Sequence, residues 1–196
     1  MCSLKYLFLK SGPYFDRICA LGNWDILLMH LKKTRHLGKL SKAGSTLLHH
    51  VCCFQPPLKV VQEIHSLYPG MVMVRDVFGR LPLHEACRFK ASREVVDFLV
   101  KSYIAAAYTQ DRQGKTPLHY AVDAGLAHEY LLLDVIMSLS VAAPGSLNIR
   151  DARGSTPVDI LSHRGGREAT ALIKYLSPMA ASYRRLATGS VMPFLA

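Results

Sequence analysis

The sequence predicts an all-α solenoid in which stacked helix-turn-helix units are joined by hairpin-like turns. Two observations predict this class: a phrase suited to a helix start recurs, and an apolar helix pattern follows each copy. The copies are TLLHHV at 46–51, LPLHEA at 81–86, TPLHYA at 116–121 and TPVDIL at 156–161. Each begins two residues after a glycine, and these glycines (Gly44, Gly79, Gly114 and Gly154) are 35, 35 and 40 residues apart. Such self-similarity indicates a stack of like units.

The first helix of each unit starts within the phrase. Thr46, Thr116 and Thr156 are predicted N-caps, because a hydroxyl there accepts a bond from a backbone N–H of the first turn. Three copies continue with a proline at the first helical position, where the missing N–H is harmless. Leu81 replaces the threonine in one copy, so we expect that unit to lose a cap worth about 1 kcal/mol.

A second helix follows in every unit. Apolar residues recur there at the i, i+3, i+4 spacing of one helix face, within 26–31, 60–64, 95–100, 135–139 and 172–176. Val95 and Val135 occupy matching positions 40 residues apart. The extra residues of the long unit are therefore expected between its two helices, within about Leu126 to Asp134.

A degraded unit fits in front of the first clear copy and begins near Ser11. Gly22, Gly125 and Gly165 each lie 11 residues after a turn position. Gly125 and Gly165 suit a left-handed residue that ends the short helix. The predicted organisation is a lead-in at 1–10, a repeat region at 11–177 with units starting near 11, 44, 79, 114 and 154, and a tail at 178–196. The atypical first and last units are expected to cap the array.

In period and phrase, the sequence resembles the ankyrin-repeat family over about Ser11 to Ser177. The resemblance implies a non-catalytic protein-protein interaction module or scaffold, with hairpin fingertips along one edge and a concave binding face. It also implies that His49, His84 and His119 tie their units to nearby backbone. Cys19, Cys52 and Cys87 fall where the family has a small core residue, so they are expected to be buried.

Composition limits the class of protein. Half of the 196 residues are apolar, which suits a continuous core. No run of about 18 apolar residues predicts a membrane span, and the apolar stretch in 1–10 is too short for a good signal peptide. Five cysteines with no framework spacing indicate a reducing compartment, so we expect an intracellular protein, cytoplasmic or nuclear.

Chemistry-bearing clusters are few. His49-His50 followed by Cys52-Cys53 is metal-like, but two ligands on one helix face are too few for a four-coordinate zinc site. Serine, histidine and aspartate occur without a nucleophile-elbow motif, and no glycine-rich phosphate loop follows a strand. We therefore predict no catalytic residue, metal, cofactor or small-molecule substrate.

Much of the excess of basic residues lies in the turns between units. The chain has 24 basic and 14 acidic residues, a formal net charge of +10. Asp76, Asp111 and Asp151 are expected to be used in turn hydrogen bonds. The basic residues of the turns then form a ridge, which we expect to bind an acidic protein partner. The second interpretation is that the ridge binds nucleic acid or an anionic membrane surface. The third is that it is an ordinary solvated surface with no binding role. The basic residues near the repeat glycines are Lys39, Lys42, Arg75, Arg80, Arg112, Lys115, Arg150 and Arg153.

Aromatic residues accompany this ridge at the first helices. Phe54, Phe89 and Tyr120 either form an apolar strip on the concave face, or the two phenylalanines tuck into the loops between helices. Exposed aromatics beside arginine are typical anchors of protein interfaces. The predicted protein-binding residues are Arg80, Arg88, Phe89, Arg112, Lys115, Tyr120 and Arg153.

Overall fold

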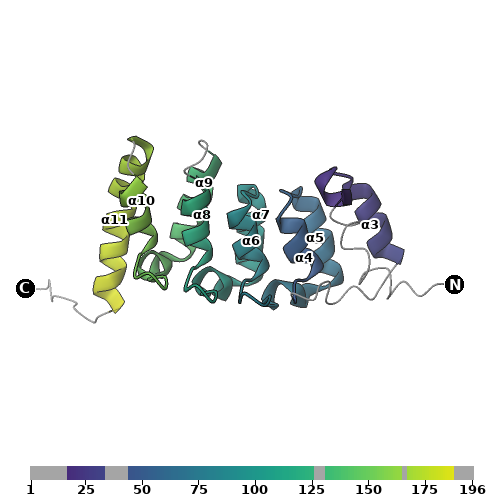
Figure 1. Cartoon of the computed structure of the whole chain (residues 1–196), viewed down its shortest axis with the longest axis horizontal. Coiled ribbons are helices and arrows are strands. Elements are labelled where there is room, and N and C mark those ends of the chain that lie inside the picture. The colour runs from purple at the N-terminus through teal and green to yellow at the C-terminus, as the bar shows by residue number, and fades with distance from the viewer. Residues whose placement is uncertain (1–16, 34–43, 126–130, 165–166, 188–196) are drawn as a thin grey trace, which may run out of the picture.

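The computed structural model describes residues 17–33, 44–125, 131–164 and 167–187. Within these ranges the chain is a row of helix pairs with no β-strand, and residues 17–20 are also helical (Figure 1). The α-helices are α3 (Trp24–Lys33), α4 (Leu47–Cys52), α5 (Leu58–Leu67), α6 (Pro82–Arg88), α7 (Arg93–Ser102), α8 (Pro117–Gly125), α9 (Leu131–Ala142), α10 (Pro157–Arg164) and α11 (Arg167–Ala187). Three 3-10 helices follow second helices: η1 (Pro69–Met73), η2 (Ile104–Tyr108) and η3 (Pro144–Asn148).

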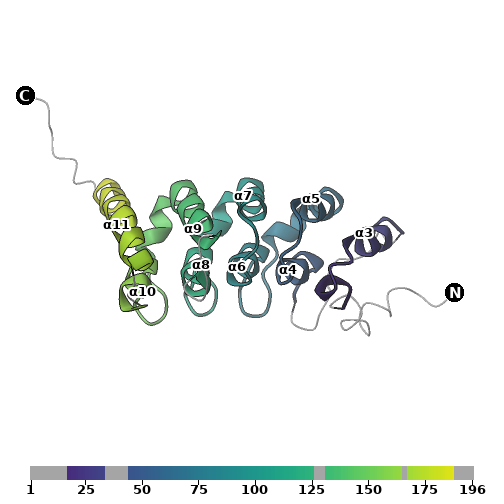
Figure 2. The same cartoon turned by 90° about the horizontal axis from the view of Figure 1, so that it is seen from above.

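The helices form two rows. Seen from above, α4, α6, α8 and α10 line one side and α5, α7, α9 and α11 the other, with the connecting turns along one edge (Figure 2). Each first helix packs on the first helix of the next unit, so α6 contacts α8, and α8 contacts α10. The predicted all-α solenoid is confirmed. None of the described helices is long and apolar enough to cross a membrane.

The core runs between the units without a break. Leu48, Leu83 and Leu118, from the same position of the phrase, are at most 2% exposed, and Ala86 and Ala121 are fully buried where the first helices meet. A small side chain at that position lets neighbouring helix backbones approach closely. The predicted cysteine positions are confirmed as core, since Cys19, Cys52 and Cys87 are all buried.

The turns are held by aspartate, as predicted. Asp76 Oδ1 accepts the backbone N–H groups of Phe78 and Arg80, both at 2.8 Å. Asp111 and Asp151 make the same pair of bonds two and four residues ahead, at 2.8 to 2.9 Å. Each carboxylate therefore satisfies two donors of its own turn and is at most 9% exposed.

Successive turns are also bonded to each other. The Arg112 N–H donates to the carbonyl of Phe78 at 2.9 Å, and the Ala152 N–H donates to the carbonyl of Gln113 at 2.9 Å. These bonds lie at the tips, where the chain reverses. The tips of three consecutive units therefore form one connected edge, with a spacing fixed by backbone contacts.

The predicted hydroxyl cap bond is confirmed at Thr156, whereas Thr46 differs from the prediction. The Thr46 hydroxyl makes no cap bond to the backbone and lies 2.9 Å from Nδ1 of His49. In the last unit Thr156 Oγ1 accepts the Asp159 N–H at 3.1 Å, while Asp159 Oδ2 accepts the Thr156 N–H at 2.9 Å. That reciprocal capping box explains the aspartate that replaces histidine there.

Leu81 has a compensation that the sequence did not reveal. Its side chain is 1% exposed and belongs to the core between units. Its N–H donates to Nδ1 of His84 at 3.0 Å, so the backbone group that starts the helix is still satisfied. Burial of a leucine side chain contributes about 2 kcal/mol, which offsets the missing hydroxyl cap.

The structure shows where the last helix ends and where the long unit has its extra residues. α11 continues through Pro178 to Ala187, so residues 178–187 do not belong to the predicted tail. Asn148 Nδ2 bonds the Ala180 carbonyl at 3.0 Å, which holds this extension on η3. In the long unit the extra length is divided, because α8 and α9 are longer than α6 and α7, and residues 126–130 lie outside the described ranges. Ser11 and Gly165 also lie outside them.

Gly125 is the last residue of α8, not a left-handed residue after it. The left-handed position at the end of the short helix is observed in other units, at Gly22 with φ of 67°, Gln55 with 51° and Lys90 with 61°. The repeat position predicted from Gly125 and Gly165 is therefore left-handed in three other units. The sequence missed that two non-glycine residues occupy it in the middle units.

Two turn glycines give a matched test of how closely the tips approach. Both have positive φ, 71° at Gly114 and 81° at Gly154, so alanine costs about 1–2 kcal/mol at either. A Cβ at Gly114 would also lie 2.7 Å from the Ala152 backbone nitrogen, whereas one at Gly154 would meet nothing within 4 Å. We expect Gly114→Ala to lower the melting temperature, followed by circular dichroism, clearly more than Gly154→Ala. Equal losses would contradict the close approach of neighbouring tips.

Candidate functional site

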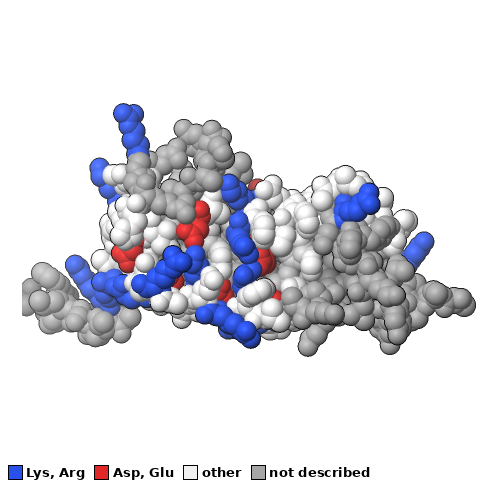
Figure 3. Space-filling model, viewed as in Figure 1, with Lys and Arg blue, Asp and Glu red and all other residues white. Residues whose placement is uncertain are grey.

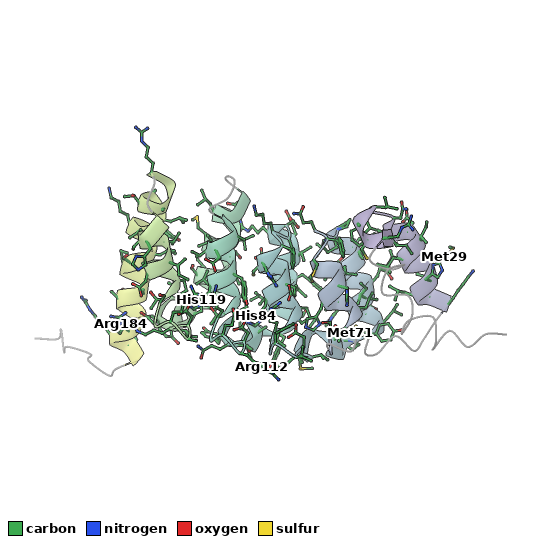
Figure 4. All side chains as sticks on the ribbon, in the orientation of Figure 1. Met29, Met71, His84, Arg112, His119 and Arg184 are labelled. Atoms are coloured by element: carbon green, nitrogen blue, oxygen red, sulfur yellow. The ribbon has the colours of Figure 1, made fainter. Side chains whose placement is uncertain are left out.

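Three buried histidines bond the start of their own helix to backbone further along the chain, and two of them, His49 and His119, reach the next unit. The Nδ1 atoms of His49, His84 and His119 accept the N–H groups of Thr46, Leu81 and Thr116 at 3.0 to 3.1 Å. A backbone N–H can only donate, so the ring proton is on Nε2. The Nε2 atoms of the same histidines lie 3.0, 3.0 and 3.1 Å from the carbonyl oxygens of Arg80, Thr109 and Ser155. Figure 4 shows His84 and His119 at corresponding places in neighbouring units.

The His49 to Cys53 cluster, which is metal-like in sequence, also bonds to backbone groups. Both ring nitrogens of His49 have backbone partners, and the Cys53 thiol donates to the His49 carbonyl at 3.3 Å. Burial raises the pKa of the Cys52 thiol well above its usual value. Among the residues that the structure describes, no group of three or more histidine, cysteine, aspartate or glutamate side chains is placed to hold a metal ion.

Several basic residues near the turns brace the array. Arg75 donates to the Gly79 carbonyl at 3.3 Å and to the Gln110 carbonyl of the next unit at 3.0 Å. Gln110, at the corresponding position, donates to the carbonyls of Gly114 and Arg150 at 2.7 and 2.9 Å. Arg150 in turn donates to the Gly154 carbonyl. Arg75 and Arg150 therefore stabilise turns as well as contributing charge.

Arg80, a predicted contact residue, lies largely within the protein. Its side chain is 15% exposed and its Nη1 donates to Glu85 Oε1 at 2.8 Å, while its Nε is 4.0 Å from Asp111 Oδ2. Arg88 lies 3.9 Å from the other Glu85 oxygen and remains 45% exposed. Glu85 is thus shared by two arginines, and the positive charge of Arg80 is largely neutralised by internal carboxylates.

Tyr120 is not the exposed aromatic that the sequence predicted. It is 7% exposed, and its hydroxyl donates to Asp111 Oδ2 at 2.6 Å. Burial, together with that carboxylate, raises the pKa of Tyr120. Lys115 lies over its ring and pairs with Asp123 at 2.6 Å. Tyr120 and Lys115 therefore support the contact between units.

The remaining predicted residues are at the surface. Phe89 is 36% exposed, with the Arg88 guanidinium 5.2 Å from its ring centre, and Arg112 and Arg153 are exposed at the turn tips. Phe54 is half-buried and packs against the core, so the expected strip of three aromatics is reduced to Phe89. Figure 3 shows basic side chains along the lower edge of the array, and Figure 4 places Arg112 there.

The sequence missed two apolar residues at the first described tip. Val77 and Phe78 are 38% and 51% exposed in the turn that Asp76 holds. The signal was available, because 77–78 aligns with 112–113 and 152–153, the positions just after the turn aspartate.

The charge of the edge follows from these contacts. Each of the turn segments 75–80, 110–115 and 150–155 has two basic residues and one aspartate. The aspartates are buried against backbone N–H groups, whereas Arg112 and Arg153 project outward. Among the described residues, neither of these arginine side chains has an ion-pair or hydrogen-bond partner. The exposed edge is therefore cationic at these two tips.

Comparison with known proteins supports the repeat assignment. Residues 48–135 match a family model described as ankyrin repeats, in 3 copies. This segment contains α4 to α8 and the start of α9. No curated protein matches the chain.

The buried histidines predict an acid-sensitive fold. Burial lowers the pKa of His49 and His119, and that of His84 falls to about 4. The unfolded chain takes up these protons below about pH 6.5, and the folded chain only at lower pH, so stability is full above 6.5 and falls on acidification. At pH 4.5 the loss from His84 is roughly 2–3 kcal/mol.

Urea unfolding between pH 7 and 4.5 checks this expectation. His84→Gln should show a shallower fall of unfolding free energy with acid than the parent chain. His163→Gln, which changes an exposed histidine of α10, should reproduce the parent slope. Equal slopes for the parent and His84→Gln would contradict the neutral buried histidine.

Proposed function

We propose that this chain is a non-catalytic scaffold for an acidic protein partner, because residues 48–135 match a model of ankyrin repeats and such repeats generally act as protein-protein interaction modules. The partner contacts the turn tips and the exposed side of the first helices. Arg112 and Arg153 lead this contact, with Arg88 and Phe89 beside them. Arg80, Lys115 and Tyr120 act behind the surface as supporting residues.

The observation that carries the proposal is the uncompensated charge at the tips. Arg112 and Arg153 are exposed on two consecutive turns whose own carboxylates are occupied by backbone N–H groups. A positive edge of this kind speeds encounter with an acidic surface and disfavours basic partners. Phe89 under the Arg88 guanidinium adds an amphipathic contact of the type enriched at interface centres.

We further propose that the protein acts inside the cell. Cys52 and Cys87 carry free thiols that are packed in the core. Free cysteines in this arrangement are typical of a reducing compartment.

Charge reversal at the tips tests the proposal. A partner is captured from native extract and purified, and its affinity is measured for the parent chain and for Arg112→Glu/Arg153→Glu. We expect binding to weaken at least about tenfold, because two attractive charges become repulsive. Arg80 is left intact, since a glutamate there would face Glu85 and Asp111.

A matched control separates the site from net charge. Lys101→Glu/Lys174→Glu changes the total charge equally, at exposed positions on α7 and α11. This control should bind as the parent chain does, with unchanged helical circular dichroism. Equal weakening by both variants, or none by the tip variant, would contradict the proposed surface. Tight, steeply salt-dependent binding to heparin or DNA in place of a protein would favour the polyanion alternative.

A further inference from the structure

The three consecutive tips differ in chemistry along the edge. The first presents Val77 and Phe78, which are 38% and 51% exposed. The second presents Arg112 and the third Arg153, both exposed. The edge is therefore apolar at one end and cationic over the next two units.

This order is fixed by direct contacts between the tips. The Arg112 N–H donates to the Phe78 carbonyl, and a Cβ placed on Gly79 would lie 3.5 Å from Cγ of Arg112. The stem of Arg112 therefore runs beside the tip that carries Phe78. The bond from Ala152 to Gln113 sets the third tip against the second in the same way.

The Phe78 ring is also held in position. The Arg80 guanidinium carbon lies 4.5 Å from the ring centre, and Arg80 is itself anchored on Glu85, which is 5% exposed. A cation stacked on an aromatic ring stabilises that arrangement by about 0.5–1 kcal/mol at an exposed site. Arg80 is thus a positioning residue that supports Phe78 while half of the phenylalanine remains open to solvent.

We propose that this edge binds an extended acidic segment of a partner protein, with an apolar side chain on Val77 and Phe78 and carboxylates on Arg112 and Arg153. The inference rests on the proposed function and specifies the partner's chemistry. Neighbouring helices pack about 8–10 Å apart, and an extended chain advances about 3.3 Å per residue. In the partner segment, the carboxylates that bind Arg112 and Arg153 should therefore lie about three and six residues from the apolar side chain that binds Phe78.

A protein segment fits better than nucleic acid. Single-stranded nucleic acid needs several stacking platforms along a continuous cationic groove. At the three described tips there is one exposed aromatic ring, already covered on one side by Arg80, and two free arginines. An apolar anchor followed by two carboxylates matches that set.

Synthetic peptides test the order of the edge. Fluorescein-labelled peptides of about ten residues carry one tryptophan with glutamates three and six residues away in a serine background, made in both chain directions. One control replaces the tryptophan by serine, and another moves it between the glutamates. By anisotropy, we expect the better direction to bind the parent chain about tenfold more tightly than either control.

Variants assign the contacts. Phe78→Ser should abolish the advantage of the tryptophan peptide and leave the serine peptide unchanged, whereas Arg112→Glu/Arg153→Glu should weaken both peptides. Phe78 is half-exposed, so its variant should keep the parent circular dichroism and melting temperature. Arg80→Lys should reduce the tryptophan advantage in part, because lysine lacks the planar stacking group.

The contrary outcomes are distinct. Equal binding of all peptides, an advantage that survives Phe78→Ser, or no binding up to about 1 mM would overturn the inference. So would an oligothymidine that binds more tightly than the tryptophan peptide and depends on Phe78. If the captured protein partner is lost on Arg112→Glu/Arg153→Glu but retained by Phe78→Ser, the proposed function stands and this inference fails.

Discussion

The structure depends on a buried, neutral histidine that bonds two units at once. His49 receives the N–H of Thr46 at the start of its own helix and donates to the Arg80 carbonyl of the next unit. A buried ring with both nitrogens satisfied fixes the spacing of helix and neighbouring backbone, and leaving either partner unpaired would cost about 1–3 kcal/mol. In the last unit Asp159 takes this position and closes a capping box on Thr156.

Most charged side chains of the turns are likewise bonded to groups within the protein. Each turn aspartate binds two N–H groups of its own loop, and Arg75 and Arg150 bind carbonyls of the loops. Arg80 and Lys115 are paired with Glu85 and Asp123. The formal charge of +10 therefore overstates what a partner meets at this edge. The free charge resides on a few side chains whose position the bonded groups determine.

Sequence repetition predicted the fold well because its signals are local. A glycine, a helix start and an apolar face recur in register, and each reports on its own backbone. Surface exposure was harder to predict. Tyr120 was predicted to be exposed, yet its hydroxyl reaches Asp111 in the turn before its helix and its ring lies against His84 of the preceding unit. The tail was predicted to begin at residue 178, but Asn148 of the preceding turn holds α11 beyond that residue. These outcomes depend on side chains brought together from separate parts of the chain.

The residues just after each turn aspartate are free to vary because the turn is built from other atoms. The aspartate carboxylate, the positive-φ glycine and the bond between tips use main-chain groups or fixed positions. Replacing Val77, Phe78 or Arg112 leaves those groups in place, so stability places little constraint on what these side chains are. The same freedom lets the tips differ from unit to unit on a rigid spacing. A partner can therefore distinguish one such array from another by the order of apolar and charged tips along the edge.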